Sequence, residues 1–473
     1  MDDDNHSDDI LAQQVEDIFA TTKDPELRAG LEDLVRTIPG PDEPYAVAKL
    51  LAALGVNVNQ PFKSWGNSFY LYTGQHWRKM PDATMRSRVY AYLDGKKYLG
   101  ANGNPTAWKP GKGNVGGIMH ALHAKVDAFE ETLTQDDGAI PVANGWLLPS
   151  TRALQPHTSA RFNLFASTVR FDPKAPKPSA WLNFLDDVLP DQESQNLLGE
   201  WFGYVLSGRT DLQKALMLKG APRSGKGTMT TVLQEMIGPG GHVGISMAML
   251  GERFGLEPVI GKSLGVIGDA RMGSNSSIAV ERLLSITGED MVSVEEKNKP
   301  AFSIRMPLRI MLLTNEMPNL RDASTALANR FLVLETGQSF LGREDVGLRD
   351  RLMAELPGIL NWALDGLDRL NEQRGFTVPV SSAQATDDLV RTTSPLSAFV
   401  ADECEVSEGA VVPASALFGH FKEWCASNGF QATNSQQFGS QLRSTLPRVD
   451  RKQRRIDGKQ QWCYTGIAVA EGR

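Results

Sequence analysis

The chain has 473 residues, of which 41% are hydrophobic and 22% are charged. Such values are typical of a globular protein of about three domains, and they exclude a small disulfide-linked peptide, wholesale disorder and a fibrous repeat. The formal net charge of −7 argues against a protein that coats nucleic acid with its whole surface, so any contact with nucleic acid is expected to be local.

Acidic residues dominate the start of the chain, and basic residues dominate the segment that follows. Residues 1–50 hold 4 Lys/Arg against 13 Asp/Glu, whereas residues 61–130 hold 10 against 4. We expect residues 1–60 to form an acidic segment of short amphipathic helices broken by a loop at 39–42. No segment of 20–50 residues repeats along the chain, which excludes a solenoid.

Aromatic residues crowd the segment 62–108, where Lys and Arg interleave with them. This mixture is expected of a surface that stacks bases and holds phosphates. The interpretation we favour is a small α+β core with solvated basic edges, because aromatic side chains usually pack inside. His120 and His123 lie one helical turn apart without an evident third ligand, so we expect a structural pair and not a metal site.

Four apolar runs with little alternation lie in the middle of the chain, at 215–218, 263–267, 308–313 and 331–334. Runs of this kind are typical of strands buried on both faces of a parallel sheet. Helical patterns separate several of them, which predicts an open α/β sheet.

A glycine-rich loop with the pattern G-x-x-x-x-G-K follows the first apolar run. Its backbone N–H groups are expected to face phosphate oxygens, and Lys226 to place a cation near the β- and γ-phosphates. Apolar residues at helical spacing then continue to Gly238, so strand, loop and helix N-terminus together predict an anion site. The expected nucleotide-binding residues are Gly220, Ala221, Pro222, Arg223, Ser224, Gly225, Lys226, Gly227 and Thr228.

Mg²⁺ is expected beside this loop. Gly227 stands where the usual motif has a Ser or Thr that holds the ion, and Thr228 is the nearest hydroxyl, about 100° further round the helix. Asp269 ends the second apolar run, at the edge where open α/β sheets bind ligands, and is the expected metal residue, although a strand-ending Asp is also a common turn former. Ala270 and Arg271 follow in place of a second acid, so the group that orients the attacking water stays unassigned.

Two further polar residues adjoin the remaining runs. Asn315 ends the third run, where its amide would orient water or contact the γ-phosphate; the alternative is an Asx turn before Pro318. Arg330 precedes the fourth run, and its guanidinium would stabilise charge on the γ-phosphate held by a neighbouring subunit; the alternative is an intramolecular salt bridge.

A β-hairpin is predicted between Asp269 and Asn315. Apolar residues alternate at 292–294 and again at 302–304, on either side of a polar turn that carries Lys297 and Lys299. A solvated tip is the ordinary expectation, but such a hairpin would also carry cations to a central pore and grip DNA phosphates without regard to sequence.

The C-terminal residues 385–473 are expected to form a winged-helix domain. A helix over 417–425 is followed by a second helix, for which Asn434 and Gln437 are a candidate capping pair, and by a hairpin over 448–467. Residues 440–473 hold 8 Lys/Arg against 3 Asp/Glu, which suits contact with duplex DNA, although a solvated basic edge or a protein partner is also compatible. The basic wing cluster consists of Arg451, Lys452, Arg454 and Arg455.

With these motifs in order, the chain resembles the superfamily 3 helicases of the AAA+ class, in particular the phage, plasmid and poxvirus-type primase-helicase family. The resemblance spans about 69–462. The segments that carry it are 69–77, 144–158 with 171–173, the phosphate loop with its Gly-Lys-Gly variant, 284–290, 314–318 and 329–330.

The resemblance implies an α/β AAA+ ATPase core over 196–380, preceded by the family's α+β domain over 61–195. It further implies a ring, usually a hexamer, that hydrolyses ATP with Mg²⁺ between subunits and moves on single-stranded and forked DNA. Lys226 would bind phosphate, Asp269 the metal and Asn315 the γ-phosphate, and Arg330 would act in trans. We therefore expect a replicative DNA helicase of a phage or mobile element.

The resemblance also suggests partner proteins and a cellular location. A separate primase or polymerase is a candidate partner, because the acidic segment is too short to be a primase. Translocation from 3′ to 5′ follows by analogy alone. Cys404, Cys425 and Cys463 form no C-x-x-C pair, and no apolar run reaches the roughly 18 residues of a membrane span, so we expect a cytoplasmic protein without a membrane partner, in the bacterial host if phage-encoded. The alternatives are an AAA+ ATPase acting as a replication initiator, or a motor that packages DNA or remodels proteins.

Overall fold

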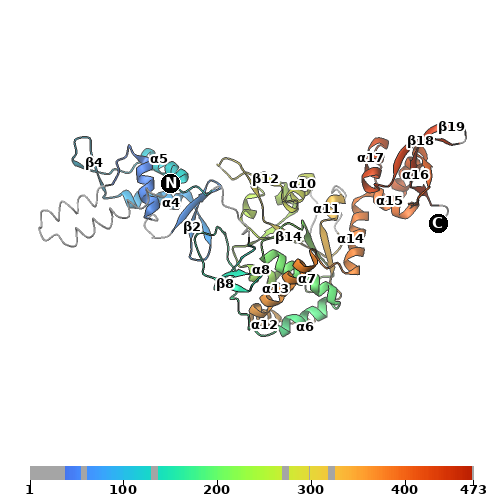
Figure 1. Cartoon of the computed structure of the whole chain (residues 1–473), viewed down its shortest axis with the longest axis horizontal. Helices are drawn as coiled ribbons and strands as arrows, with labels where there is room; N and C mark the ends of the chain where they lie inside the picture. Colours follow the sequence, from blue (N-terminus) through green and yellow to red (C-terminus); the bar gives the residue numbers. More distant parts are fainter. Residues whose placement is uncertain are drawn as a thin grey trace. The chain divides into compact units, whose positions relative to one another are not determined.

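The computed structural model describes residues 38–54, 61–128, 137–268, 276–297, 299–317, 325–456 and 458–470. The chain forms two compact units (Figure 1). The first takes in the described residues up to 128 together with His157–Phe165, and the second takes in the rest. No helix in these ranges is long and apolar enough to cross a membrane. The helices expected before residue 38 lie outside the described residues.

The first unit is an α+β fold around an aromatic core. A three-stranded antiparallel sheet in the order β1-β2-β3 packs with helices, and Phe69, Trp77 and Trp108 are at most 4% exposed. The favoured interpretation of the aromatic-rich segment, a core with basic edges, is thus confirmed for these rings. The elements are α3 (Pro44–Ala53), β1 (Phe62–Trp65), β2 (Ser68–Tyr72), β3 (Trp77–Met80), α4 (Asp82–Leu93), β4 (Lys97–Leu99), β5 (Pro105–Ala107) and α5 (Lys112–Lys125).

His123 packs in this core, whereas His120, the other member of the expected structural pair, is exposed. Its ring stacks on Phe69 with the ring centroids 3.9 Å apart, and its Nδ1 lies 2.7 Å from the hydroxyl of Ser64.

The second unit begins with a small antiparallel sheet and two helices. Residues 137–156 and 166–195, expected from the sequence to be part of the preceding domain, belong to this unit. The physical reason is a long-range hydrogen bond, in which the hydroxyl of Ser167 donates to the carbonyl of Met236 at the end of α8. The elements are β6 (Ile140–Val142), β7 (Gly145–Leu148), β8 (Ala153–Gln155), α6 (Ser179–Val188) and α7 (Gln192–Leu206).

A five-stranded, wholly parallel sheet in the order β10-β11-β14-β9-β15 forms the centre of this unit. The four predicted apolar runs are β11, β14, β9 and β15, so the expected open α/β sheet is confirmed. The fifth strand, β10, was not predicted, because it is short, carries Gly244 and is half-exposed, and therefore shows no apolar run. The strands are β9 (Ala215–Lys219), β10 (His242–Ile245), β11 (Leu264–Gly268), β14 (Arg309–Thr314) and β15 (Phe331–Glu335).

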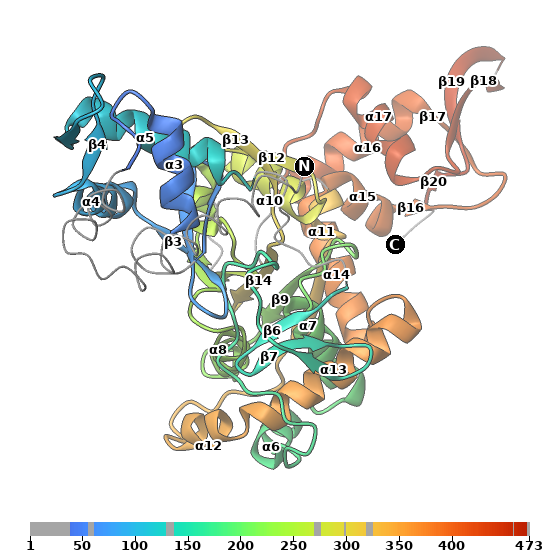
Figure 2. The ribbon, with the colours of Figure 1, turned by 60° about the vertical axis from the view of Figure 1, so that its left-hand side comes forward.

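Helices connect and cover these strands, and α7 packs along α13 (Figure 2). Glycines allow the close approach, since a Cβ on Gly366 would lie 2.3 Å from the carbonyl carbon of Gly199. The helices are α8 (Lys226–Ile237), α9 (Met247–Gly251), the 3₁₀ turn η2 (Glu257–Val259), α10 (Ser276–Thr287), α11 (Thr325–Ala328), α12 (Leu348–Ala354), α13 (Leu356–Gln373) and α14 (Val380–Thr393).

The predicted hairpin is present as β12 (Met291–Val294) and β13 (Phe302–Arg305). The strands pair antiparallel with Met291 opposite Arg305 and Val294 opposite Phe302. In both ribbon views the hairpin lies next to α10, which it also contacts (Figures 1 and 2).

The C-terminal module has the predicted order of helix, helix and hairpin, with the Asn434 side chain accepting from the N–H of Gln437 as the cap of α17. The structure adds an earlier helix, α15, and a third strand, β17, which pairs with β19; both are too short or too mixed in pattern to stand out in the sequence. The elements are α15 (Pro395–Glu403), β16 (Cys404–Glu405), β17 (Val411–Pro413), α16 (Ala414–Ser427), α17 (Ser435–Thr445), β18 (Asp450–Ile456), β19 (Lys459–Thr465) and β20 (Ala468–Val469).

Candidate functional site

The glycine-rich loop joins the carboxyl end of β9 to the first turn of α8, as predicted. Arg223 and Gly225 have φ angles of 59° and 92°, so the backbone turns through the left-handed region just before the helix begins at Lys226. Glycine takes this conformation without steric cost, whereas it costs Arg223 free energy. The loop thereby directs the free N–H groups of the helix N-terminus at one point, where the helix dipole favours an anion.

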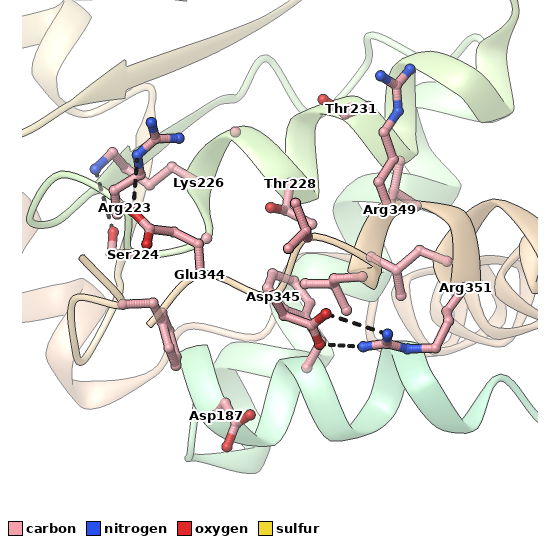
Figure 3. Close-up of a pocket in the computed structure, with 18 of the residues that line it drawn as sticks. Asp187, Arg223, Ser224, Lys226, Thr228, Thr231, Glu344, Asp345, Arg349 and Arg351 are labelled. Carbon is pink, nitrogen blue, oxygen red and sulfur yellow. Dashed lines mark hydrogen bonds and ion pairs between the residues drawn. The ribbon is translucent and has the colours of Figure 1, made fainter. Parts of the chain in front are cut away.

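Lys226 lies folded against this loop and is 9% exposed. Its ammonium donates to the carbonyls of Gly220 and Ala221, at 2.6 and 2.8 Å. It also donates to the hydroxyl of Ser224 at 3.4 Å (Figure 3). Burial lowers the pKa of Lys226 from its ordinary value. The ammonium is therefore held against the backbone of the loop, beside the N-terminus of α8.

Asn315 joins the same cluster, because its Oδ1 accepts from the Lys226 ammonium at 3.2 Å. The strand order brings this about: β14 lies directly beside β9, so the carboxyl ends of both strands meet at one edge of the sheet. In the turn after β14 the hydroxyl of Thr314 donates to the carbonyl of Glu316, while Pro318, before which an Asx turn at Asn315 was the alternative, lies outside the described residues.

A segment after β15, residues 336–346, lies along the phosphate loop and was not predicted from the sequence. The Thr336 and Ser224 hydroxyls are hydrogen-bonded at 2.6 Å, the N–H of Phe340 donates to Arg223 O at 2.9 Å, and Ser339 donates to Pro222 O at 2.7 Å. The position of Thr336 directly after the last apolar run was the available signal, since this too is the carboxyl end of a parallel strand.

A cavity of about 870 Å³ opens beside the loop. Its walls come from the loop, α6, the start of α8, the 336–346 segment and α12, and its volume suits a ligand of nucleotide size (Figure 3). Charged side chains around it are largely paired: Arg351 with Asp345, Arg349 with Glu235 at 3.2 Å, and Arg223 with Glu344 at 3.7 Å.

Of the two expected metal residues, the structure describes Thr228 only. Thr228 lines the cavity, and its hydroxyl has no hydrogen-bond partner in the described part of the chain, so it fits the role of an oxygen ligand. Asp269 lies outside the described residues, as do Ala270 and Arg271. Strand β11 ends at Gly268, one residue before Asp269, on the same edge of the sheet as the loop.

Arg330 lies directly before β15, at the end of the sheet where the parallel strands begin and opposite the end that carries the glycine-rich loop. Its Nη1 donates to the carbonyl of Leu284 at 2.5 Å and to the hydroxyl of Thr287 at 2.7 Å, both in the last turn of α10. The contact is with a carbonyl and a hydroxyl, so the alternative of an intramolecular salt bridge is not the arrangement found among the described residues.

The two hairpin lysines differ in their surroundings. Lys297 is exposed. Lys299 is not a solvated tip residue: its side chain is 24% exposed and its ammonium lies 3.3 Å from the carboxylate of Glu296, which is itself buried.

All four residues of the basic wing cluster are exposed on β18. The guanidinium of Arg451 lies over the ring of Trp462, 4.8 Å from its centroid, and Trp462 is 48% exposed. The hairpin is somewhat shorter than predicted at both ends, beginning at Asp450 and ending at Thr465, after which Gly466 turns the chain at a φ of 90°.

Comparison with known proteins finds family matches for two segments of the chain. A family of unknown function, DUF5906, matches residues 218–330, and the RFX DNA-binding domain matches residues 395–471. Over 73 residues, 15% of this chain, the sequence is 32% identical both to regulatory factor X 4 of Xenopus laevis and to transcription factor RFX4 of Mus musculus. The match spans 10% of the length of each of these relatives. The RFX match supports the winged-helix interpretation of the C-terminal module.

Solved structures extend the likeness to most of the chain. Two apo structures of the C-terminal region of NrS-1 each cover 90% of this chain, with 100% and 99% of their own chains covered. Their TM-scores are 0.50 and 0.51 at sequence identities of 12% and 13%. At such identities the likeness shows a mixed α/β fold with a parallel sheet and does not by itself carry an activity.

Proposed function

We propose that this chain is an ATP-dependent, ring-forming DNA helicase with a P-loop ATPase core of the AAA+ class, acting in DNA replication. The observation that carries the proposal is the meeting of Lys226 and Asn315 at the phosphate loop, at one edge of a wholly parallel sheet. A cation, a polar amide and a helix N-terminus at one point are the groups that bind and orient a γ-phosphate.

Hydrolysis would depend on positioning and on stabilisation of charge. Lys226 and the loop N–H groups would hold the β- and γ-phosphates, and Asn315 would orient the Lys226 ammonium and contact the γ-phosphate. Thr228, with Asp269 from the sequence, would hold Mg²⁺, which supplies neutralisation of the charge that develops on the phosphate oxygens. The 870 Å³ cavity beside the loop is the space for the nucleoside.

The position of Arg330 favours a ring over a monomer. Arg330 directly precedes the pairing of β15 with β9, where its carbonyl accepts from the N–H of Ala215, and Lys214 lies six positions before Gly220 of the loop. Six residues of extended strand span about 20 Å, farther than an arginine side chain reaches. Arg330 would therefore contact only the nucleotide of a neighbouring subunit, as the resemblance implies.

DNA binding is supported at the C-terminal module. The similarity to the RFX DNA-binding domain covers α15 to β20, and the exposed wing carries four cations beside an exposed tryptophan. Cations contact backbone phosphates, and the grip on duplex DNA would thus lie in a module separate from the hairpin that follows the single strand.

Steady-state ATP hydrolysis by the full chain, with and without a single-stranded oligonucleotide, tests the proposal. We expect stimulation by DNA, loss of turnover in Lys226→Ala, and loss of the stimulation alone in Lys297→Ala. Lys174→Ala, which removes an exposed lysine outside the loop and the hairpin, is the matched control and should behave as the parent.

Unwinding of a forked duplex separates the helicase from its rivals. Hydrolysis without unwinding would favour a motor that packages DNA or remodels proteins. Slow turnover with tight, sequence-selective binding through the C-terminal module would favour a replication initiator that uses ATP as a switch.

A further inference from the structure

Residues that precede strand β9 hold the segment 288–290 at the start of the β12–β13 hairpin, which we call the hairpin root. Helix α10 ends at Thr287, and Gly288 to Asp290 lead directly into β12. The hydroxyl of Thr210, in the loop before β9, donates to the carboxylate of Glu289, and Gln213 Nε2 donates to the carbonyl of Gly288 at 3.3 Å. Movement of the amino ends of the strands would therefore move the hairpin root.

Arg330 makes the third contact with this root and is oriented by it. Its Nη1 carries two N–H groups, and these go to the carbonyl of Leu284 and the hydroxyl of Thr287. The helix dipole adds to the attraction, because the last carbonyls of α10 carry partial negative charge. Within the described residues, neither Nε nor Nη2 of Arg330 has a hydrogen-bond partner, so its other three N–H groups are available to a phosphate.

The hairpin root is closely packed, so the side chains of Arg330 and Thr287 have little room to change position. Thr287 is 6% exposed, and a Cβ on Gly288 would lie 3.0 Å from Nη1 of Arg330 and 2.8 Å from the carbonyl of Leu284. The chain that leads from α10 to the hairpin thus passes in direct contact with the guanidinium.

The same arginine is tied to the strand that ends at the phosphate loop. Its carbonyl accepts from the N–H of Ala215 at 2.8 Å, and the ammonium of Lys214 donates to the carbonyl of Asn329 at 2.7 Å. Strand β9 runs from Ala215 to Lys219, next to Gly220 of the loop. Arg330 therefore stands between two elements: the strand of its own phosphate loop and the root of the hairpin.

We propose that Thr287 is the positioning residue for Arg330, and that the Arg330–Thr287 contact couples nucleotide hydrolysis at the subunit interface to the hairpin. Thr287 fixes one end of the guanidinium in cis and leaves the other end for the γ-phosphate of the neighbouring subunit. When that phosphate is released, the guanidinium of Arg330 loses its attraction to it and can shift. Because Arg330 contacts the last turn of α10, such a shift would move the hairpin that follows this turn. This inference rests on the proposed function.

The Thr287→Val substitution removes the accepting hydroxyl while keeping the shape of the side chain, and Thr287→Ser keeps the hydroxyl. Thr386→Val is the matched control. Thr386 donates to the carbonyl four residues before it in α14, at 2.8 Å, as Thr287 does in α10 at 2.6 Å, but without an arginine contact among the described residues.

Hydrolysis of ATP by each full-length variant is measured with and without an oligo-dT strand, together with the dissociation constant for a fluorescent ATP analogue. For Thr287→Val we expect kcat with DNA to fall about tenfold, the order of one hydrogen bond to a charged group, with KM and nucleotide binding within about twofold of the parent. Thr287→Ser and Thr386→Val should retain the parent's stimulation.

A Thr287→Val chain with the same DNA-stimulated kcat as Thr386→Val would overturn the inference and leave the proposed function standing. A parent chain that DNA does not stimulate would overturn both. If Thr287→Val fails to fold, Thr287→Ala takes its place, because it removes the same accepting hydroxyl with a smaller side chain. Unchanged stimulation in that variant likewise overturns the inference.

Discussion

Replacing Asn315 by Asp exchanges the amide oxygen that accepts from Lys226 for a carboxylate oxygen. At the 3.2 Å separation, and with an effective dielectric constant of about 20, the carboxylate would attract the ammonium by about 5 kcal/mol. Because Asn315 is exposed, screening by solvent leaves about 2 kcal/mol of this attraction. The lysine would be held away from phosphate, and the new charge would repel the triphosphate.

We therefore expect Asn315→Asp to weaken ATP binding about 30-fold, as 2 kcal/mol requires. Asn315→Ala removes an acceptor without adding charge, so it should lower kcat about tenfold and change binding little. Dissociation constants for a fluorescent ATP analogue and steady-state kcat and KM distinguish the two effects. Asn428→Asp, which adds the same charge in the C-terminal module, is the control. ATP binding to Asn315→Asp as tight as to Asn315→Ala would refute the reasoning.

Two further substitutions test the metal and the DNA contacts. Thr228→Ala should lower Mg²⁺-dependent ATP hydrolysis by at least about tenfold, because it removes the hydroxyl expected to hold the ion. Adding Gly227→Ser should restore hydrolysis, since a Cβ at Gly227 meets nothing within 4 Å. A Mg²⁺ titration in which Thr228→Ala matches the parent would assign the ion to other ligands. Arg454→Ala should reduce the slope of log affinity for duplex DNA against log salt by about 0.9, with each further residue of the basic wing cluster adding a similar amount, as measured between about 50 and 200 mM salt; an unchanged slope would mean that the wing does not contact phosphates.

Periodicity and loop chemistry are local properties of the chain, and the features that depend on them were predictable. Four of the five parallel strands, the phosphate loop with α8, the hairpin and the cap at Asn434 all correspond to patterns within about ten residues. Strand β10 and helix α15 were not predictable in this way, because neither carries a distinct apolar period and both depend on neighbours far along the chain.

The contacts that make the site were decided by the tertiary structure. Lys226 and Asn315 are 89 residues apart, and they meet only because β14 pairs directly with β9, an order that apolar runs do not encode. The same holds for Thr336 against Ser224 and for Arg330 against Thr287. Residue types and their spacing thus indicated candidate functional side chains, whereas strand order, which depends on the packing of the whole sheet, decided which of them touch.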